Sequence, residues 1–175
     1  MASTVEHVLR ASRIPILVAR AYQPSAPQKS GSFVGDQPFF RRILLPLDGS
    51  SASEAVIPHV LELGRMLDTL VVVLHVKVEG PEGWNGGPRP WEQQLDEVAR
   101  TLSAVGLKTL VVRLQGDPLS SILAFARPSA VDLIAMTTHG SSGNLWQMGS
   151  VTLGVLRNAV IPTLVVRAPT AASRG

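Results

Sequence analysis

Two segments rich in glycine, serine and threonine could bind a ligand through backbone groups and small polar side chains. The first, Asp48-Gly49-Ser50, follows the apolar run 43–47, and the second runs from Thr137 to Gly143 and leads to Gly149-Ser150. Glycine lets a backbone approach a ligand closely, and a helix beginning at Ser150 would offer free N–H groups and a favourable dipole to a phosphate. The pattern predicts an anion cradle made of Ser141, Ser142, Gly143, Gly149 and Ser150.

The sequence contains no recognisable catalytic set of residues. It has no cysteine, which excludes disulfides, thiolate catalysis and cysteine-ligated metals. Its four histidines have no close pairing of the kind that binds a metal, so we expect no metal site. His139 lies in the second loop, whereas His75 lies in an apolar run and is interpreted as a core histidine. Asp48 could either form the turn or contact a ligand.

The composition predicts one folded domain with a sizeable core. Of the 175 residues, 45% are apolar and 17% are charged. The net charge is only +3 and aromatic residues make up 5%, so we expect no nucleic-acid partner. The longest apolar stretch, 70–76, is too short to cross a membrane, and the N-terminus lacks a signal-peptide pattern. We therefore expect a cytoplasmic protein without a membrane partner.

Alternating strands and helices are expected to position the two loops. The continuous apolar runs are typical of strands covered on both faces, as in parallel sheets. Ligands of such open sheets bind beyond the carboxyl ends of the strands, where the winding reverses. A helix over about 55–67 could begin with a cap from Ser51 or Ser53. The other expected elements are strands at 43–46, 70–76, 109–114, 133–136 and 163–167, and helices at 91–105, 119–127 and 150–159.

The N-terminal segment resembles the C-terminal end of the same chain. Residues 3–21 align without gaps with residues 150–168 and are identical at ten of nineteen positions. We interpret residues 1–22 as the last helix and strand of an upstream copy of the domain; the alternative is a chance likeness of two helix–strand units. This interpretation makes 23–40 a linker, 41–168 the domain and 169–175 a tail.

Several motifs, in this order, resemble the universal stress protein family. They are Ile43–Ser50, Leu74–Val76, Gly116–Pro118, Asp132–Gly140, Gly149–Val151, Val155–Arg157 and Ile161–Val166. The resemblance implies an open, doubly wound α/β fold of the adenine nucleotide alpha hydrolase type. Its five parallel strands would have the order 3-2-1-4-5, with helices on both faces. One branch of the family binds ATP through Gly-x2-Gly-x9-Gly-[Ser/Thr].

The resemblance also implies a set of nucleotide-binding residues. Thr137 replaces the first glycine of the motif, and eight residues rather than nine separate Gly140 from Gly149. By this resemblance, Asp48 and Val76 would hold the adenine and ribose, and the glycines and Ser150 would hold the phosphates. The predicted site consists of Pro46, Leu47, Asp48, Val76, Met136, Thr137, Gly140, Ser141, Gly143, Gly149, Ser150 and Val151.

Three functions are compatible with this site. The first is a regulatory protein of the stress response that binds ATP or AMP, with Mg²⁺ possible alongside ATP. The second is a module of the same fold that dimerises or docks partners without a nucleotide. The third is a weak ATP hydrolase, for which no base or metal site is identifiable.

The resemblance also implies a homodimer in which the last strand, Thr163–Arg167, pairs with its own copy across a two-fold axis. Residues Pro15–Arg20 could replace that copy and pair antiparallel with Thr163–Arg167. The pairing could lie within one chain or between two chains, because the linker can span either distance. Either arrangement would cover an otherwise exposed sheet edge.

Overall fold

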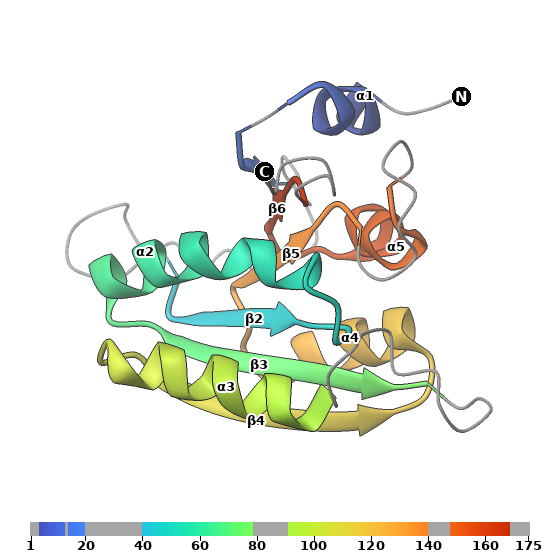
Figure 1. Ribbon diagram of the computed structural model, residues 1–175. Coiled ribbons are helices and arrows are strands. Elements are labelled where there is room, and N and C mark those ends of the chain that lie inside the picture. The colour runs from blue at the N-terminus through green and yellow to red at the C-terminus, as the bar shows by residue number, and fades with distance from the viewer. Residues whose placement is uncertain (1–3, 13, 20–39, 79–90, 140–147, 169–175) are drawn as a thin grey trace.

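In the part of the chain that the structure describes, six strands form one sheet at the centre of the molecule (Figure 1). The computed structural model describes residues 4–12, 14–19, 40–78, 91–139 and 148–168. The strand order is β1-β6-β5-β2-β3-β4. The five strands from β2 to β6 run parallel, and their spatial order confirms the predicted 3-2-1-4-5. β1 adds an antiparallel strand at one edge, so the sheet is mixed.

The helices and strands lie close to the ranges that the sequence predicts. Helix ends differ by a residue or two because the outermost turns depend on local capping. The elements are α1 (Thr4–Ala11), β1 (Ile16–Val18), β2 (Arg42–Pro46), the 3₁₀ helix η1 (Ser53–Val56), α2 (Ile57–Leu67), β3 (Leu70–Lys77), α3 (Trp91–Ala104), β4 (Lys108–Gln115), α4 (Pro118–Ala126), β5 (Leu133–Thr137), α5 (Ser150–Asn158) and β6 (Thr163–Val166).

Two apolar cores lie on opposite faces of the sheet. Successive side chains of a strand point to opposite faces, so Ile43 and Leu45 belong to one core and Leu44 to the other. The first core packs under η1, α2 and α3, and the second under α4 and α5. The central residues of β2 and β3 are buried on both faces, which explains why their sequences are continuously apolar.

The loops that start the strands are fixed by specific contacts. The Asp132 carboxylate accepts the backbone N–H groups of Arg41 at 2.8 Å and Arg42 at 3.1 Å, which aligns the start of β2 with that of β5. Gly106 follows α3 with a φ of 87°, a left-handed conformation that a glycine adopts without strain. These contacts set the register of the sheet and therefore where its strands end.

The edge strand β1 confirms the antiparallel pairing predicted for the N-terminal segment. Ile16 lies opposite Val165, Leu17 opposite Leu164 and Val18 opposite Thr163, all within one chain. α1 and β1 lie at the end of the sheet where α5 and β6 lie (Figure 1). That this segment derives from an upstream copy stays a prediction, as do the domain boundaries. The predicted linker up to residue 39 and the tail 169–175 lie outside the described residues.

Candidate functional site

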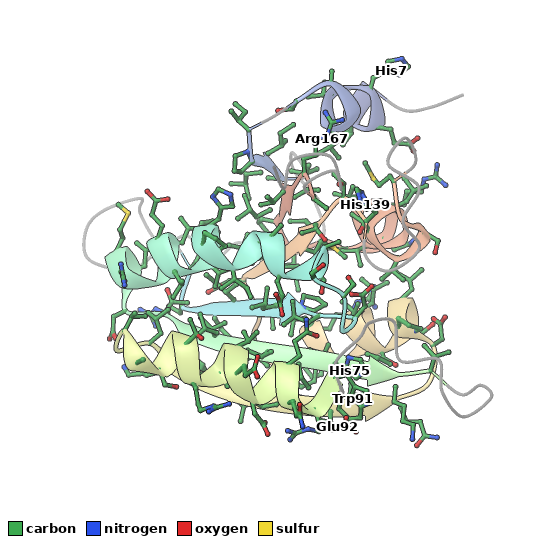
Figure 2. All side chains as sticks on the ribbon, in the orientation of Figure 1. His7, His75, Trp91, Glu92, His139 and Arg167 are labelled. Carbon is green, nitrogen blue, oxygen red and sulfur yellow. The ribbon has the colours of Figure 1, made fainter. Side chains whose placement is uncertain are left out.

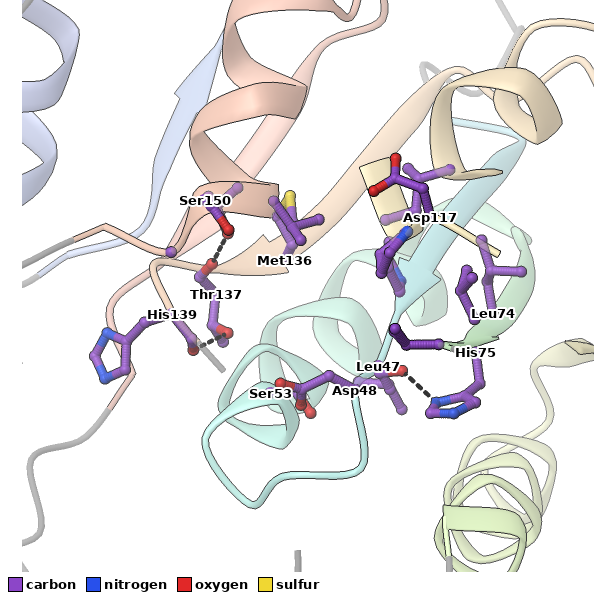
Figure 3. Close-up of a pocket in the computed structure, with 18 of the residues that line it drawn as sticks. Leu47, Asp48, Ser53, Leu74, His75, Asp117, Met136, Thr137, His139 and Ser150 are labelled. Atoms are coloured by element: carbon purple, nitrogen blue, oxygen red, sulfur yellow. Dashed lines mark hydrogen bonds between the residues drawn. The ribbon is translucent and has the colours of Figure 1, made fainter. Parts of the chain in front are cut away.

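A pocket opens at the carboxyl ends of the central strands. β2 pairs with β3 on one side and with β5 on the other, so the winding of the sheet reverses at β2. The pocket lies at this point, has a cavity volume of about 390 Å³ and is bordered by the first residues of α3, α4 and α5 (Figure 3). Both its volume and its position at a reversal of winding are typical of small-molecule sites in open α/β sheets.

The loop after β2 forms one wall, and Asp48 organises it. The Asp48 carboxylate accepts the N–H of Ser50 at 3.0 Å and the hydroxyl of Ser50 at 2.6 Å. The hydroxyl oxygen of Ser50 in turn accepts the N–H of Ser53 at 3.2 Å. The predicted cap from Ser51 or Ser53 is therefore wrong: η1 has Ala52 at its N-cap without a side-chain bond. The turn at Asp48 and Ser50 supplies the acceptor instead.

His75 and Trp91 hold this loop from the side of α3. The Nδ1–H of His75 donates to the carbonyl of Leu47 at 2.9 Å, because a carbonyl oxygen can only accept. The imidazole stacks on the indole of Trp91 with ring centroids 4.3 Å apart (Figure 2). Burial lowers the pKa of His75, while the bond to Leu47 and the charge of Asp48 act in the opposite direction. His75 is thus the buried, hydrogen-bonded histidine predicted from the sequence, and it also lines the pocket.

The opposite wall is apolar. Met136 on β5, Leu74 and Val76 on β3, and Ile122 on α4 all line the pocket and belong to the second core or pack against it. A flat heteroaromatic ring would remove such a surface from water. The pocket therefore combines an apolar wall with a carboxylate on the facing loop.

Two hydrogen bonds tie the end of β5 to the start of α5, and a third lies within the loop that follows β5. The hydroxyl of Thr137 donates to the His139 carbonyl at 2.9 Å, Gly149 N–H donates to the Thr138 carbonyl at 2.8 Å, and the hydroxyl of Thr152 donates to the Thr137 carbonyl at 2.8 Å. A Cβ on Gly149 would lie 3.4 Å from the Cα of His139, so a side chain there would be tightly packed. The structure thus accommodates Thr137 at the first motif position by turning its hydroxyl onto its own loop.

α5 begins at the pocket with Gly149 as its N-cap and without a side-chain cap. The first N–H groups of an α-helix have no partner within the helix, and the helix dipole favours negative charge there. Ser150 and Val151, the first residues of α5, both line the pocket. This end of the pocket therefore has the chemistry of an anion site.

Nine of the twelve predicted site residues line this one pocket. They are Pro46, Leu47, Asp48, Val76, Met136, Thr137, Gly149, Ser150 and Val151. Gly140, Ser141 and Gly143 lie outside the described residues, as does Ser142 of the predicted cradle. The sequence thus located the pocket, while the binding of a nucleotide by these residues stays a prediction.

Further lining residues were missed at the sequence level. Lys77, the last residue of β3, and Asp117 also line the pocket, and Asp117 caps α4 by accepting Ser120 N–H at 2.8 Å. Lys77 could have been found, because it directly follows Val76 on the same strand. The stack of Trp91 on His75 leaves no local signal, since sixteen positions separate the two residues in sequence.

His139 lies at the start of the loop between β5 and α5. It is buried, and its Nδ1 lies 3.1 Å from the Thr138 hydroxyl oxygen, which also accepts the N–H of Ala168 at 3.3 Å. Burial lowers the pKa of His139, and the nearby charge of Arg167 lowers it further. Figure 3 shows its ring directed away from Asp48 and His75. Its place is therefore at the border of the pocket rather than at its centre.

The described residues show neither a metal centre nor a membrane span. Among them, no group of three or more histidine, aspartate or glutamate side chains could hold a metal ion. None of the helices described is long and apolar enough to cross a membrane.

Solved structures with bound adenine nucleotides share this fold. One is a universal stress protein in complex with cAMP, with a TM-score of 0.57 and 18% identity over 73% of this chain and 96% of that chain. Another is a universal stress protein family member from Arabidopsis thaliana with AMP bound, with a TM-score of 0.55 and 16% identity over 77% and 95%. At these identities the likeness shows the fold alone.

Two relatives with higher identity align with this chain over most of their own length. Universal stress protein MJ0531 of Methanocaldococcus jannaschii is 29% identical over 142 residues, which are 74% of this chain and 84% of the relative. The solved structure of MJ0577, from the same organism, has a TM-score of 0.66 and 26% identity over 76% of this chain and 99% of that chain. The profile of the universal stress protein family matches residues 39–167. This match covers well over half of the sequence and includes every strand that ends at the pocket, so the chain belongs to the universal stress protein family.

Proposed function

We propose that this protein is a regulatory module that binds an adenine nucleotide, AMP or ATP, in the pocket at the ends of β2, β3 and β5. One observation carries the proposal: one cavity joins an apolar wall, the Asp48 carboxylate and the start of α5, whose N-cap Gly149 has no side chain. These are the three chemistries that a base, its amino group and a phosphate require. Family members with bound AMP and cAMP support it by analogy.

Each part of the ligand has a place in this arrangement. The adenine ring packs on Val76 and Met136, and the Asp48 carboxylate accepts a hydrogen bond from its exocyclic amino group. The phosphates reach the N–H groups at Ser150 and Val151. Mg²⁺ would accompany ATP through the phosphate oxygens. Binding stabilises the folded domain by mass action, and this stabilisation is the signal that a regulatory protein can transmit.

The identity of the base is the sharpest test. Because one oxygen of Asp48 is held by Ser50, Asp48→Asn should keep the turn while replacing an acceptor by an amide donor. We expect wild-type protein to bind AMP at least tenfold more tightly than IMP, whose ring carries an oxygen at that position. Asp48→Asn should lose this preference or reverse it. Isothermal titration calorimetry with AMP, IMP, ATP and ATP with Mg²⁺ measures both.

Asp68→Asn is the matched control. Asp68 is exposed at the opposite end of the sheet, has a left-handed φ of 46° that asparagine tolerates, and pairs with Lys108. It should leave the AMP-to-IMP ratio unchanged. The proposal would be contradicted if the wild-type protein bound none of the four ligands at millimolar concentration. The function that docks partners without a nucleotide would then be favoured. ATP turnover that Asp48→Asn abolishes would instead support the weak hydrolase.

A further inference from the structure

The pairing of β1 with β6 is symmetric under exchange of the two similar segments. Each residue of the segment 3–21 aligns with the residue 147 positions later, as Ser3 does with Ser150. Under this alignment the pair Ile16–Val165 becomes Val18–Thr163, which is also an observed pair, and Leu17–Leu164 becomes itself. A local two-fold axis therefore passes between Leu17 and Leu164.

α1 also contacts the helix with which its sequence aligns. α1 aligns with residues 151–158, which lie within α5, and the two helices are joined by an ion pair in which Arg157 donates to Glu6 at 2.8 Å. Glu6 and Leu9 are both buried, with 6% and 3% of their surfaces exposed. The unit formed by α1 and β1, which we name the N-terminal cap, thus contacts α5 through the ion pair of Glu6 with Arg157 and pairs with β6 along a strand.

We propose that the N-terminal cap is an in-chain substitute for a second copy of this protein. A segment that looks like α5–β6 pairs with α5–β6 about a two-fold axis, so the outer edge of β6 fits its own copy. Once the cap leaves, β6 of a second chain pairs antiparallel with it in the same register, and Leu164 faces its own copy. The cap therefore blocks self-association along this edge while it is bound.

Two features favour the cap over a second chain. A tethered segment competes at an effective concentration of about millimolar, which a separate chain reaches only when it is very concentrated. The cap also differs from α5 at the contact with Arg157: Glu6 aligns with Leu153, so a second copy would not offer this ion pair. The sequence difference thus favours closure within one chain.

Single cysteines can test this inference, because the chain has none of its own. Leu164→Cys places one thiol on the local axis, where directly opposed strand residues lie close enough for a disulfide. With the native cap, mild oxidation should leave this variant uncross-linked. Adding Leu9→Asp, which puts a charge into the buried face of α1, should raise the covalent dimer at least tenfold. Electrophoresis without reductant and light scattering measure it.

Val8→Asp is the matched control, since Val8 is the neighbouring residue of the same helix and is 49% exposed. In the Leu164→Cys background it should leave the protein uncross-linked. Leu17→Cys with Leu164→Cys should form a disulfide within one chain, and this lock should keep the protein monomeric even with Leu9→Asp. Because this disulfide holds the cap in place, it shows whether dimers form through release of the cap or through unfolding of the domain. Circular dichroism of each variant checks that the domain is folded.

Three results would overturn the inference. One is a variant with both Leu9→Asp and Leu164→Cys that is folded but forms no covalent dimer. Another is equal cross-linking of Leu164→Cys with and without Leu9→Asp. The third is a covalent dimer from the Leu17→Cys, Leu164→Cys pair, because the cap would then be exchanged between chains.

Discussion

The two similar segments of this chain have very different surroundings. Val155 of α5 is completely buried, whereas its counterpart Val8 of α1 is 49% exposed. Leu164 of β6 is 8% exposed, and its counterpart Leu17 is 50% exposed. α5 and β6 complete the layers formed by α4 and β5, while α1 and β1 lie on the outer edge of the sheet. The same apolar pattern therefore yields a core in one place and a surface in the other.

The residues that differ between the segments reflect this contrast. Gly154 of α5 packs so closely on α4 that a Cβ would lie 2.4 Å from a methyl group of Leu119. The counterpart in α1 is His7, which is exposed and lies on the outside of the molecule (Figure 2). A large polar residue is accepted where none of the described helices packs against that face, and glycine is kept where one does. The burial of a position in the folded chain, rather than the apolar pattern that the two segments share, thus decides which residue types the position accepts.

Truncating the paired leucines should show the contrast most strongly. Leu164→Ala should lower the free energy of unfolding by about 3 kcal/mol, because it leaves a cavity in the first core. Leu17→Ala should lower it by about 1 kcal/mol, because half of that side chain is already in water. Urea denaturation of the full chain measures both. Equal losses would mean that β1 is as deeply packed as β6.

The helices offer the same comparison on a smaller scale. Val155→Ala removes two methyl groups from the second core and should lower the free energy of unfolding by about 2 kcal/mol. Val8→Ala should change it by less than about 0.5 kcal/mol, since Ala is also the better helix former. Thermal and urea denaturation should agree. A loss at Val8 as large as that at Val155 would place the exposed face of α1 inside a packed interface.

Much of the fold could be predicted from the sequence, because strands buried on both faces leave continuous apolar runs such as Leu70–Val76. The strand order came from the family resemblance, since apolar periodicity does not distinguish between neighbours in a sheet. The predicted cap before α2 was wrong because the acceptors lie earlier in the chain: Asp48 accepts the N–H of Ser50, and the Ser50 hydroxyl accepts the N–H of Ser53.

The candidate site was predictable in part for a similar reason. Residues at strand ends, such as Asp48 and Thr137, follow directly from the topology of a parallel sheet. The pairing of His75 with Trp91 depends on where α3 is laid across β3, which no local pattern encodes. The register between Leu17 and Leu164 was not predicted either, although the similarity of the two segments pointed to an antiparallel pair.

The buried His75 and His139 and the exposed His7 should also differ in how they make the stability depend on pH. The pKa values of His75 and His139 are both lowered, mainly by burial. The charges of Asp48 and Glu92 raise the pKa of His75, and that of Arg113 lowers it. The charge of Arg167 lowers the pKa of His139. The unfolded chain therefore binds more protons just below the ordinary histidine pKa of about 6.5, so the free energy of unfolding falls as the pH falls through this value.

We expect a lower urea midpoint at pH 5.5 than at pH 7.5, with a slope of at most about 1.4 kcal/mol per pH unit for each buried histidine. His139→Gln should flatten this slope, and combining it with His75→Gln should flatten it further, since glutamine can still donate to the Leu47 carbonyl. His7→Gln, a change in the exposed copy, is the control and should leave the slope as in wild type. A slope that survives in the double variant would assign the pH dependence to groups other than His75 and His139.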